Sequence, residues 1–149
     1  MKVKDCMCDT VCCVKSDSKL SDVAKLMCTN HTGCIPVCNE SNCVVGLVTD
    51  RDIVLRAVAC NKDATQTPVS EIMTCNVCTC KEDDEMYNVE NQMAENQVRR
   101  VPVCDCDNHL VGMVTVGDLA NKCNQLGKEE VCTTIENICN CKGETKNAE

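Results

Sequence analysis

One short motif occurs twice in this chain, as Gly46-Leu47-Val48-Thr49-Asp50-Arg51-Asp52 and, 66 residues later, as Gly112-Met113-Val114-Thr115-Val116-Gly117-Asp118. Both copies keep the glycine, the threonine and the final aspartate, with two apolar residues after the glycine. The same offset aligns the flanking sequence without a gap, so that Pro36-Val37-Cys38 falls on Pro102-Val103-Cys104. Chance does not produce such a register over most of a chain, so the sequence contains two copies of one unit.

Each copy shows the same pattern of predicted elements. A short extended piece and an amphipathic helix precede two strands joined by a polar turn, and a second helix follows the motif. The polar stretches 16–18 and 82–84 are expected to cap the first helix of each copy. The strands are expected at 34–38, 44–49, 100–104 and 110–115. A further amphipathic helix is predicted over 129–139.

We therefore expect an α/β fold in which two β-α-β-β-α repeats pack about a pseudo-twofold axis, because a unit of about 55 residues is near the lower limit for an independent core. Residues 1–62 form the first repeat, 63–126 the second, and 127–149 a C-terminal helix and tail. The segment 3–7 lies either against the first repeat or swapped towards the second. A cleft at the interface of two repeats is a favoured place for a small ligand.

Composition argues against two classes of partner. The chain carries a formal charge of −8, no Phe or Trp and a single Tyr. An acidic field repels a phosphate backbone, and base stacking needs aromatic rings, so we expect no nucleic-acid partner. No apolar run approaches the ~20 residues of a membrane span, and the N-terminus lacks a signal-peptide core. The prediction is a soluble, cytoplasmic protein without a membrane partner.

The repeated motif resembles that of a tandem CBS-domain pair, the regulatory module named after cystathionine β-synthase. The resemblance covers about residues 3–125. It rests on two Gly-h-h-Thr-x-x-Asp motifs (h, apolar), each after a Pro-Val strand, and on the Val-x-(Asp/Glu)-x-Met segment opening each copy, Val3–Met7 and Val69–Met73. It implies a stand-alone ligand sensor, most often a homodimer, that binds an adenosine-containing molecule such as AMP, ADP, ATP or S-adenosylmethionine. The resemblance implies no cofactor, and the signal would pass to an unidentified effector protein.

The resemblance also implies which residues touch the ligand. In the family, the motif threonine and aspartate hold phosphate and ribose, and residues around the Pro-Val strand hold phosphate or line the adenine pocket. The candidates carried over are Thr49, Arg51, Asp52, Thr115 and Asp118 from the motifs, Ile35, Pro36, Arg99, Arg100, Val101 and Pro102 from the Pro-Val strands, and Val11 and Val77 from the extended pieces.

The chemistry of these residues is sensible without the family. An aspartate at the start of a helix can accept both hydroxyls of a ribose diol, and arginine is a preferred bidentate ligand for phosphate. The alternative is that both aspartates only stabilise helix N-termini through the dipole. The positions matching Arg99 and Arg100 are Gly33 and Cys34, so the two sites are not expected to be equivalent.

The chain has eighteen cysteines, which no feature of the repeat requires. Close spacings such as Cys75-x-x-Cys78-x-Cys80 and Cys104-x-Cys106 can bind zinc or a soft metal ion. The alternative function is therefore a thiol-rich metal-binding or redox protein on the same scaffold. In a reducing cytosol most of the thiols are expected to be free. We expect no enzyme, because neither histidine stands in a nucleophile motif and no phosphate loop is present.

Overall fold

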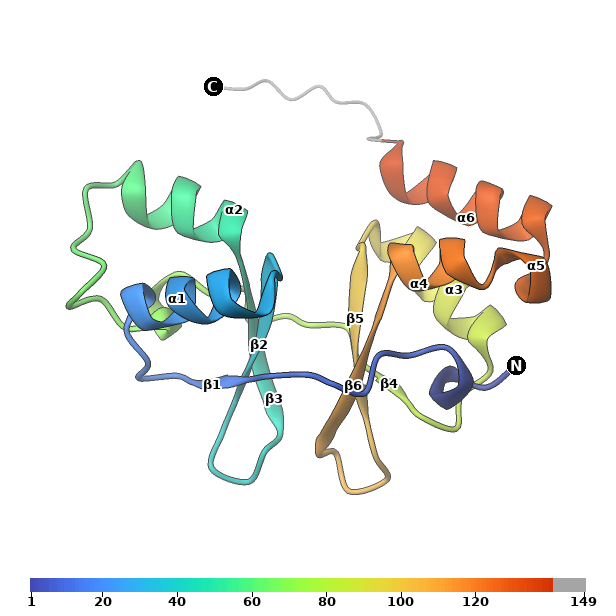
Figure 1. Ribbon diagram of the computed structural model, residues 1–149, viewed down its shortest axis with the longest axis horizontal. Coiled ribbons are helices and arrows are strands. Elements are labelled where there is room, and N and C mark those ends of the chain that lie inside the picture. Colours follow the sequence, from blue (N-terminus) through green and yellow to red (C-terminus); the bar gives the residue numbers. More distant parts are fainter. Residues whose placement is uncertain (141–149) are drawn as a thin grey trace. The chain divides into compact units, whose positions relative to one another are not determined.

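The computed structural model describes residues 1–140, which contain two three-stranded sheets with strand orders β1-β2-β3 and β4-β5-β6 (Figure 1). The sheets belong to two units, each assembled from more than one stretch of chain. The first-repeat unit comprises Thr10–Val77 and Cys104–Val111, and the second-repeat unit comprises Met1–Asp9, Cys78–Val103 and residues 112–140. Both sheets carry helices, so the predicted α/β class with two β-α-β-β-α repeats is confirmed.

The first-repeat unit packs one helix face against its sheet. Its core contains Leu20 and Val23 from the first helix and Ile35, Val37 and Val48 from the sheet, all 0% exposed. The first strand runs parallel to the second, and the second runs antiparallel to the third. The elements in chain order are β1 (Val14–Lys15), α1 (Leu20–Asn30), β2 (Cys34–Cys38), β3 (Val44–Thr49), α2 (Asp50–Ile53), the π-helix η2 (Val54–Val58) and the 3-10 helix η3 (Val69–Glu71).

The second-repeat unit repeats this arrangement and adds a helix. Its core includes Met93, Val101 and Leu119, each 0% exposed. The elements are η1 (Val3–Asp5), β4 (Cys80–Lys81), α3 (Met86–Asn96), β5 (Arg100–Cys104), β6 (Leu110–Thr115), α4 (Val116–Asn121), α5 (Cys123–Leu126) and α6 (Lys128–Cys139). The added helix α6 packs on α3 and buries Val131 and Ile138. No helix within residues 1–140 is long and apolar enough to cross a membrane.

Each opening segment packs on the repeat to which it does not belong. The backbone N–H of Val3 donates to Asp84 O at 3.0 Å, and the N–H of Val69 donates to Ser18 O at 2.7 Å. Of the two placements considered for segment 3–7, the swapped one is correct and the one against the first repeat is wrong. The repeat boundaries at 62 and 126 stay a prediction, since the units are interleaved in sequence.

The motif glycines are explained by these exchanged segments. A Cβ atom at Gly46 would lie 2.5 Å from Met73 Sδ, and one at Gly112 would lie 2.6 Å from Met7 Sδ. Real Cβ atoms do not approach a neighbour so closely, so any larger residue would require the methionine side chain to shift. The glycine of the motif and the methionine of the opening segment therefore form one packing contact in each unit.

The predicted strands agree with β2, β3, β5 and β6 at both ends. The predicted helix caps are wrong. The N-caps of α1 and α3 are Lys19 and Glu85, and neither makes a side-chain cap. The polar residues before them close turns instead: Ser18 Oγ accepts from the N–H of Lys15 at 3.2 Å. A short polar side chain that bonds a preceding strand residue is no longer available to the helix.

Candidate ligand-binding sites

The second-repeat motif forms a capping box where β6 meets α4. Thr115 is the N-cap of α4, and its Oγ1 accepts from the N–H of Asp118 at 3.2 Å. In return, Asp118 Oδ2 accepts from the N–H and from the hydroxyl of Thr115, both at 2.8 Å. These bonds hold the carboxylate in one orientation at the end of the sheet.

Only one oxygen of this carboxylate is used. Among residues 1–140, Asp118 Oδ1 has no hydrogen bond and no ion pair, and the residue is only half-buried. An ionised carboxylate oxygen of this kind is an acceptor for a hydroxyl donor from a ligand. The structure thus supports both readings of the motif aspartate: one oxygen caps the helix and the other is available.

The two arginines at the start of the second Pro-Val strand differ in exposure, since Arg99 is exposed and Arg100 is half-buried. Arg99 O accepts from the N–H of Val116 at 3.1 Å, which sets the start of β5 beside the start of α4. The guanidinium of Arg99 is directed elsewhere, with Nη2 4.0 Å from Cys139 Sγ near the end of α6. Arg100, the first residue of β5, is half-buried. Val101 and Pro102 are buried in the sheet, so their backbone is the part that can face a ligand.

The first-repeat motif forms the same box with an additional partner. Thr49 Oγ1 accepts from the N–H of Asp52 at 3.1 Å, and Asp52 Oδ2 accepts from the N–H of Thr49 at 3.0 Å. Here the other oxygen is engaged, because Arg56 Nε lies 3.7 Å from Asp52 Oδ1. Arg56 also donates to Ile72 O at 3.0 Å, which holds the guanidinium in place. The i,i+4 spacing of Asp52 and Arg56 was the sequence signal for this pair.

The first-repeat site also lacks a cation where the second has Arg99. At the equivalent position a Cβ on Gly33 would lie 2.8 Å from Asp50 Oδ2, so an acidic side chain covers this glycine. Asp50 replaces Val116 of the second copy, and its Oδ1 accepts from the N–H of Arg51 at 2.8 Å. Arg51 itself is exposed. The two sites therefore differ in charge: where the second copy has Arg99 and Val116, the first has Gly33 and the acidic Asp50.

The remaining four candidates differ in burial. The side chain of Ile35 is 0% exposed within the first-repeat core and Pro36 is buried, so neither side chain faces solvent. Val11 and Val77 are half-buried and precede β1 and β4. The burial of these four residues does not contradict their prediction as ligand contacts. Only Val11 and Val77, however, have exposed side-chain surface that a ligand can touch.

A cavity of about 350 Å³ opens between α3 and α6 of the second-repeat unit, away from the motif residues. Its lining includes Glu90, Glu129 and Glu130. Glu90 is 4% exposed and hydrogen-bonds Thr134, and burial, followed by the charge of Glu130, raises the pKa of its carboxyl. The buried acid therefore belongs to the contact between the two helices.

The comparisons with known proteins identify the family and the fold. The CBS domain family model matches twice, over residues 3–58 and 69–124. The CBS domain-containing protein YhcV of Bacillus subtilis is 38% identical over 136 residues, which is 91% of this chain and 94% of the relative.

Two solved structures are similar over most of the chain. One is Hypoxic Response Protein I with two coordinated zinc ions, at TM-score 0.74 and 31% identity, covering 81% of this chain and 98% of the other. The second is the CBS domain pair of protein MJ0100 with 5-methylthioadenosine and S-adenosyl-L-methionine, at TM-score 0.73 and 30% identity, with the same coverage. With two matching domains in register and relatives that align over nearly their whole length, the chain belongs to the CBS domain family.

Proposed function

We propose that this chain is a non-catalytic regulatory module that binds an adenosine-containing ligand, and that the second-repeat motif is its stronger site. The observation that carries this proposal is the orientation of Asp118. Its Oδ2 is held by Thr115, while its Oδ1 has no partner among residues 1–140. A fixed carboxylate with one available oxygen is suited to a ribose hydroxyl.

The neighbouring residues supply the rest of the recognition. Arg100, at the start of β5, is the candidate cation for a phosphate or a carboxylate of the ligand. Arginine binds such groups through parallel N–H donors. The complex of the MJ0100 domain pair with 5-methylthioadenosine and S-adenosyl-L-methionine supports an adenosine moiety as the common part of the ligand.

The experiment is a calorimetric titration of the full chain with adenosine, AMP, ATP, S-adenosylmethionine and 5-methylthioadenosine. Asp118→Ala should weaken adenosine and AMP alike, because its partner is the ribose. Arg100→Ala should weaken AMP and ATP by at least about tenfold and adenosine much less, because a hydrogen bond to a charged group contributes about 1.5–3 kcal/mol. Lys128→Ala, an exposed change at the start of α6, is the control and should leave all affinities unchanged.

The absence of binding by every adenosine compound would overturn the proposed ligand class. Unchanged AMP and ATP affinities in both variants would overturn the site while leaving the ligand class standing. The proposal extends to a homodimer whose response is read by an effector protein. Sedimentation equilibrium with and without the bound compound tests the dimer.

A second candidate function is metal binding through cysteine thiols. One observation favours it specifically: the similar structure of Hypoxic Response Protein I contains two coordinated zinc ions. This chain has eighteen cysteines with which to bind such an ion. Zinc content of protein purified under reducing conditions, measured by plasma mass spectrometry, tests this candidate independently of nucleotide binding.

A further inference from the structure

The cavity between α3 and α6 of the second-repeat unit lies where these two helices pack together (Figure 1). Tyr87, Glu90 and Ala94 of α3 line it from positions i, i+3 and i+7, which share one face of a helix. From α6, Glu129 and Glu130 line it as well. Its volume of about 350 Å³ falls within the range of about 300–1,000 Å³ that small-molecule sites occupy. The cavity therefore has room for a small ligand.

Glu90 places a buried carboxyl group in this cavity. It is 4% exposed and has no ion-pair partner among residues 1–140. Its one hydrogen-bond partner in this part of the chain is the hydroxyl of Thr134, another lining residue, which donates a single proton. One carboxyl oxygen is thus left without a donor. Because burying a carboxylate without a partner of opposite charge is costly, a cation supplied by a ligand would stabilise Glu90.

The repeat itself does not require this acid. The counterpart of Glu90 in α1 is Ala24, and the counterpart of Tyr87 is Ser21. The same helix therefore forms in the first copy without the acid and without the aromatic ring. A residue that lowers stability without a role in the fold is expected at functional positions. We therefore connect Glu90 and Tyr87 with the cavity and not with the helix.

The charge of the cavity wall indicates what the cavity attracts. Glu90, Glu129 and Glu130 contribute three carboxyl groups, and no Lys, Arg or His is among the lining residues. Burial, followed by the charge of Glu130, raises the pKa of Glu90, as expected where acids face a site without a cation. A positively charged ligand complements this wall, and an anionic ligand does not.

The glutamates are spread too widely for one metal ion to bind all three. A calcium or magnesium ion lies about 2.0–2.6 Å from its oxygen ligands, so these oxygens are within about 5 Å of one another. Among residues 1–140, the one group of three acidic, His or Cys side chains whose ligand atoms lie within 4.8 Å of one another is Asp105, Asp107 and His109. A ligand needs positive charge at more than one point to reach all three glutamates.

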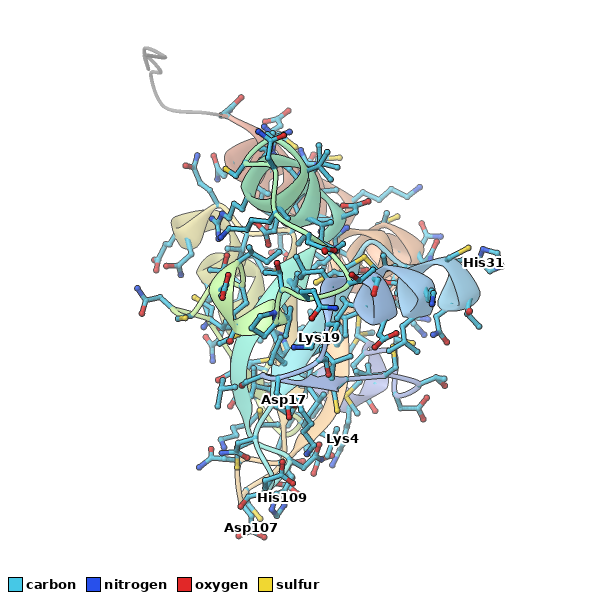
Figure 2. All side chains as sticks on the ribbon, turned by 90° about the vertical axis from the view of Figure 1, so that its left-hand side faces the viewer. Lys4, Asp17, Lys19, His31, Asp107 and His109 are labelled. Carbon is cyan, nitrogen blue, oxygen red and sulfur yellow. The ribbon has the colours of Figure 1, made fainter. Side chains whose placement is uncertain are left out.

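The group that does meet this distance is explained by its own turn. Figure 2 shows Asp107 and His109 at the tip of the β5–β6 turn. Asp105 Oδ1 accepts from the N–H groups of both residues at 2.9 Å, which closes an Asx turn. Asn39, the counterpart of Asp105, closes the same turn in the first copy with a neutral amide. The turn therefore needs no metal ion.

We propose that the cavity between α3 and α6 binds an organic diamine. One ammonium group pairs with Glu90, and the other pairs with the exposed carboxylates of Glu129 and Glu130. The hydrocarbon chain between them contacts Ala94 and the ring of Tyr87, whose face also attracts an ammonium group. This site goes beyond the adenosine site and shares no residue with it, so each can fail without the other.

The test is a calorimetric titration of the full chain with putrescine, a diamine, and with butylamine and calcium as the comparison probes. Wild-type protein should bind one putrescine per chain and should bind butylamine, which has one charge, at least about tenfold more weakly. Glu90→Gln keeps the shape of the side chain and should weaken putrescine binding by at least about tenfold. Tyr87→Ala should weaken it by about threefold.

Glu136→Gln is the matched control, because it removes the same charge from an exposed position of α6 that does not line the cavity. It should change putrescine affinity by less than about twofold, as should Asp118→Ala. Circular dichroism checks that each variant is folded. Equal losses in Glu90→Gln and Glu136→Gln would reduce the effect to general attraction by an acidic chain and overturn the site. Undetectable putrescine binding by the wild type, or tighter binding of calcium than of putrescine, would overturn the ligand class.

Discussion

The two motif sites share one backbone arrangement and differ in what surrounds it. In both, a threonine caps a helix and an aspartate three residues later completes the box. Asp52 is then paired with Arg56, and Asp50 adds a negative charge over Gly33. Asp118 keeps an oxygen available beside a strand that begins with an arginine. The comparison teaches that the capping box is structural in both repeats, and that the duplication did not preserve the charged neighbours on which the proposed ligand binding depends.

The first helices of the two repeats, α1 and α3, also differ in what covers them. Glu90 of α3 is buried under α6, while its counterpart in α1, Ala24, is exposed. The first repeat has no equivalent of α6 among residues 1–140, and it leaves Val54, Leu55 and Val58 of η2 exposed. One repeat thus carries an extra helix and a buried acid, and the other carries an uncovered apolar helix face.

The largest effect should separate the two aspartates. Asparagine keeps an acceptor for the capping box but removes the charge, so Asp118→Asn and Asp52→Asn are matched changes. We expect Asp118→Asn to weaken AMP binding by about 10–100-fold, since a hydrogen bond to a charged group contributes about 1.5–3 kcal/mol. Asp52→Asn should change it by less than about twofold. Calorimetry measures both, and equal losses would show that the sites are equivalent.

The motif glycines should differ in their tolerance of a methyl group. A Cβ at Gly112 would meet Met7 Sδ at 2.6 Å and the backbone Cys8 O at 2.9 Å, whereas the close contacts of one at Gly46 are all with the Met73 side chain. A flexible methionine can move and a backbone oxygen cannot. Gly112→Ala should therefore lower the free energy of unfolding by about 2 kcal/mol and Gly46→Ala by less.

Urea denaturation of the two variants measures this difference. Met7→Ala added to Gly112→Ala tests the cause, because it removes the methionine clash and leaves the clash with Cys8 O. Only part of the lost stability should return. Full recovery would show that the backbone contact is unimportant, and no difference between the two glycine variants would contradict the comparison.

The buried acid of the second repeat should make stability depend on pH. Burial raises the pKa of Glu90, so the folded state binds its proton more tightly than the unfolded state does. Wild-type stability should then fall as pH rises from the ordinary value through the raised one. Glu90→Gln removes this dependence and should raise the Tm at pH 7 by roughly 3 °C, for about 1 kcal/mol.

The advantage of Glu90→Gln should vanish below about pH 4, where the glutamate is neutral in both states. Glu129→Gln is the control, because this residue is exposed on α6 and lines the same cavity. Differential scanning fluorimetry from about pH 3 to about pH 8 measures both variants. A constant difference across this range would contradict the assignment to burial.

The smallest effect should come from converting one site into the other. Gly33→Arg combined with Asp50→Val gives the first repeat the residues found at Arg99 and Val116 in the second. Removing Asp50 also removes the carboxylate that a side chain at Gly33 would meet. We expect AMP affinity at the first site to rise by about threefold, since an exposed charge pair contributes up to about 1 kcal/mol. Titration in an Asp118→Asn background isolates this site.

Local sequence determined the elements of the fold. The strands β2, β3, β5 and β6 follow from short apolar runs bounded by polar turns, and the internal repeat established that the second copy folds like the first. The motif threonine and aspartate were likewise readable, because a capping box involves only residues three apart. Such features depend on contacts along a few residues of chain, so a linear pattern is enough to predict them.

Tertiary structure decided the contacts between distant residues. It directed the Arg99 guanidinium towards α6, exchanged the opening segments between repeats and brought Cys13 Sγ to 3.8 Å from Asn42 Oδ1. A pattern along the chain does not show which strands become neighbours in the fold. Residues far apart in sequence become neighbours because their contact allows apolar surfaces to be buried together. This burial depends on the complete fold, so no single segment of the sequence predicts it.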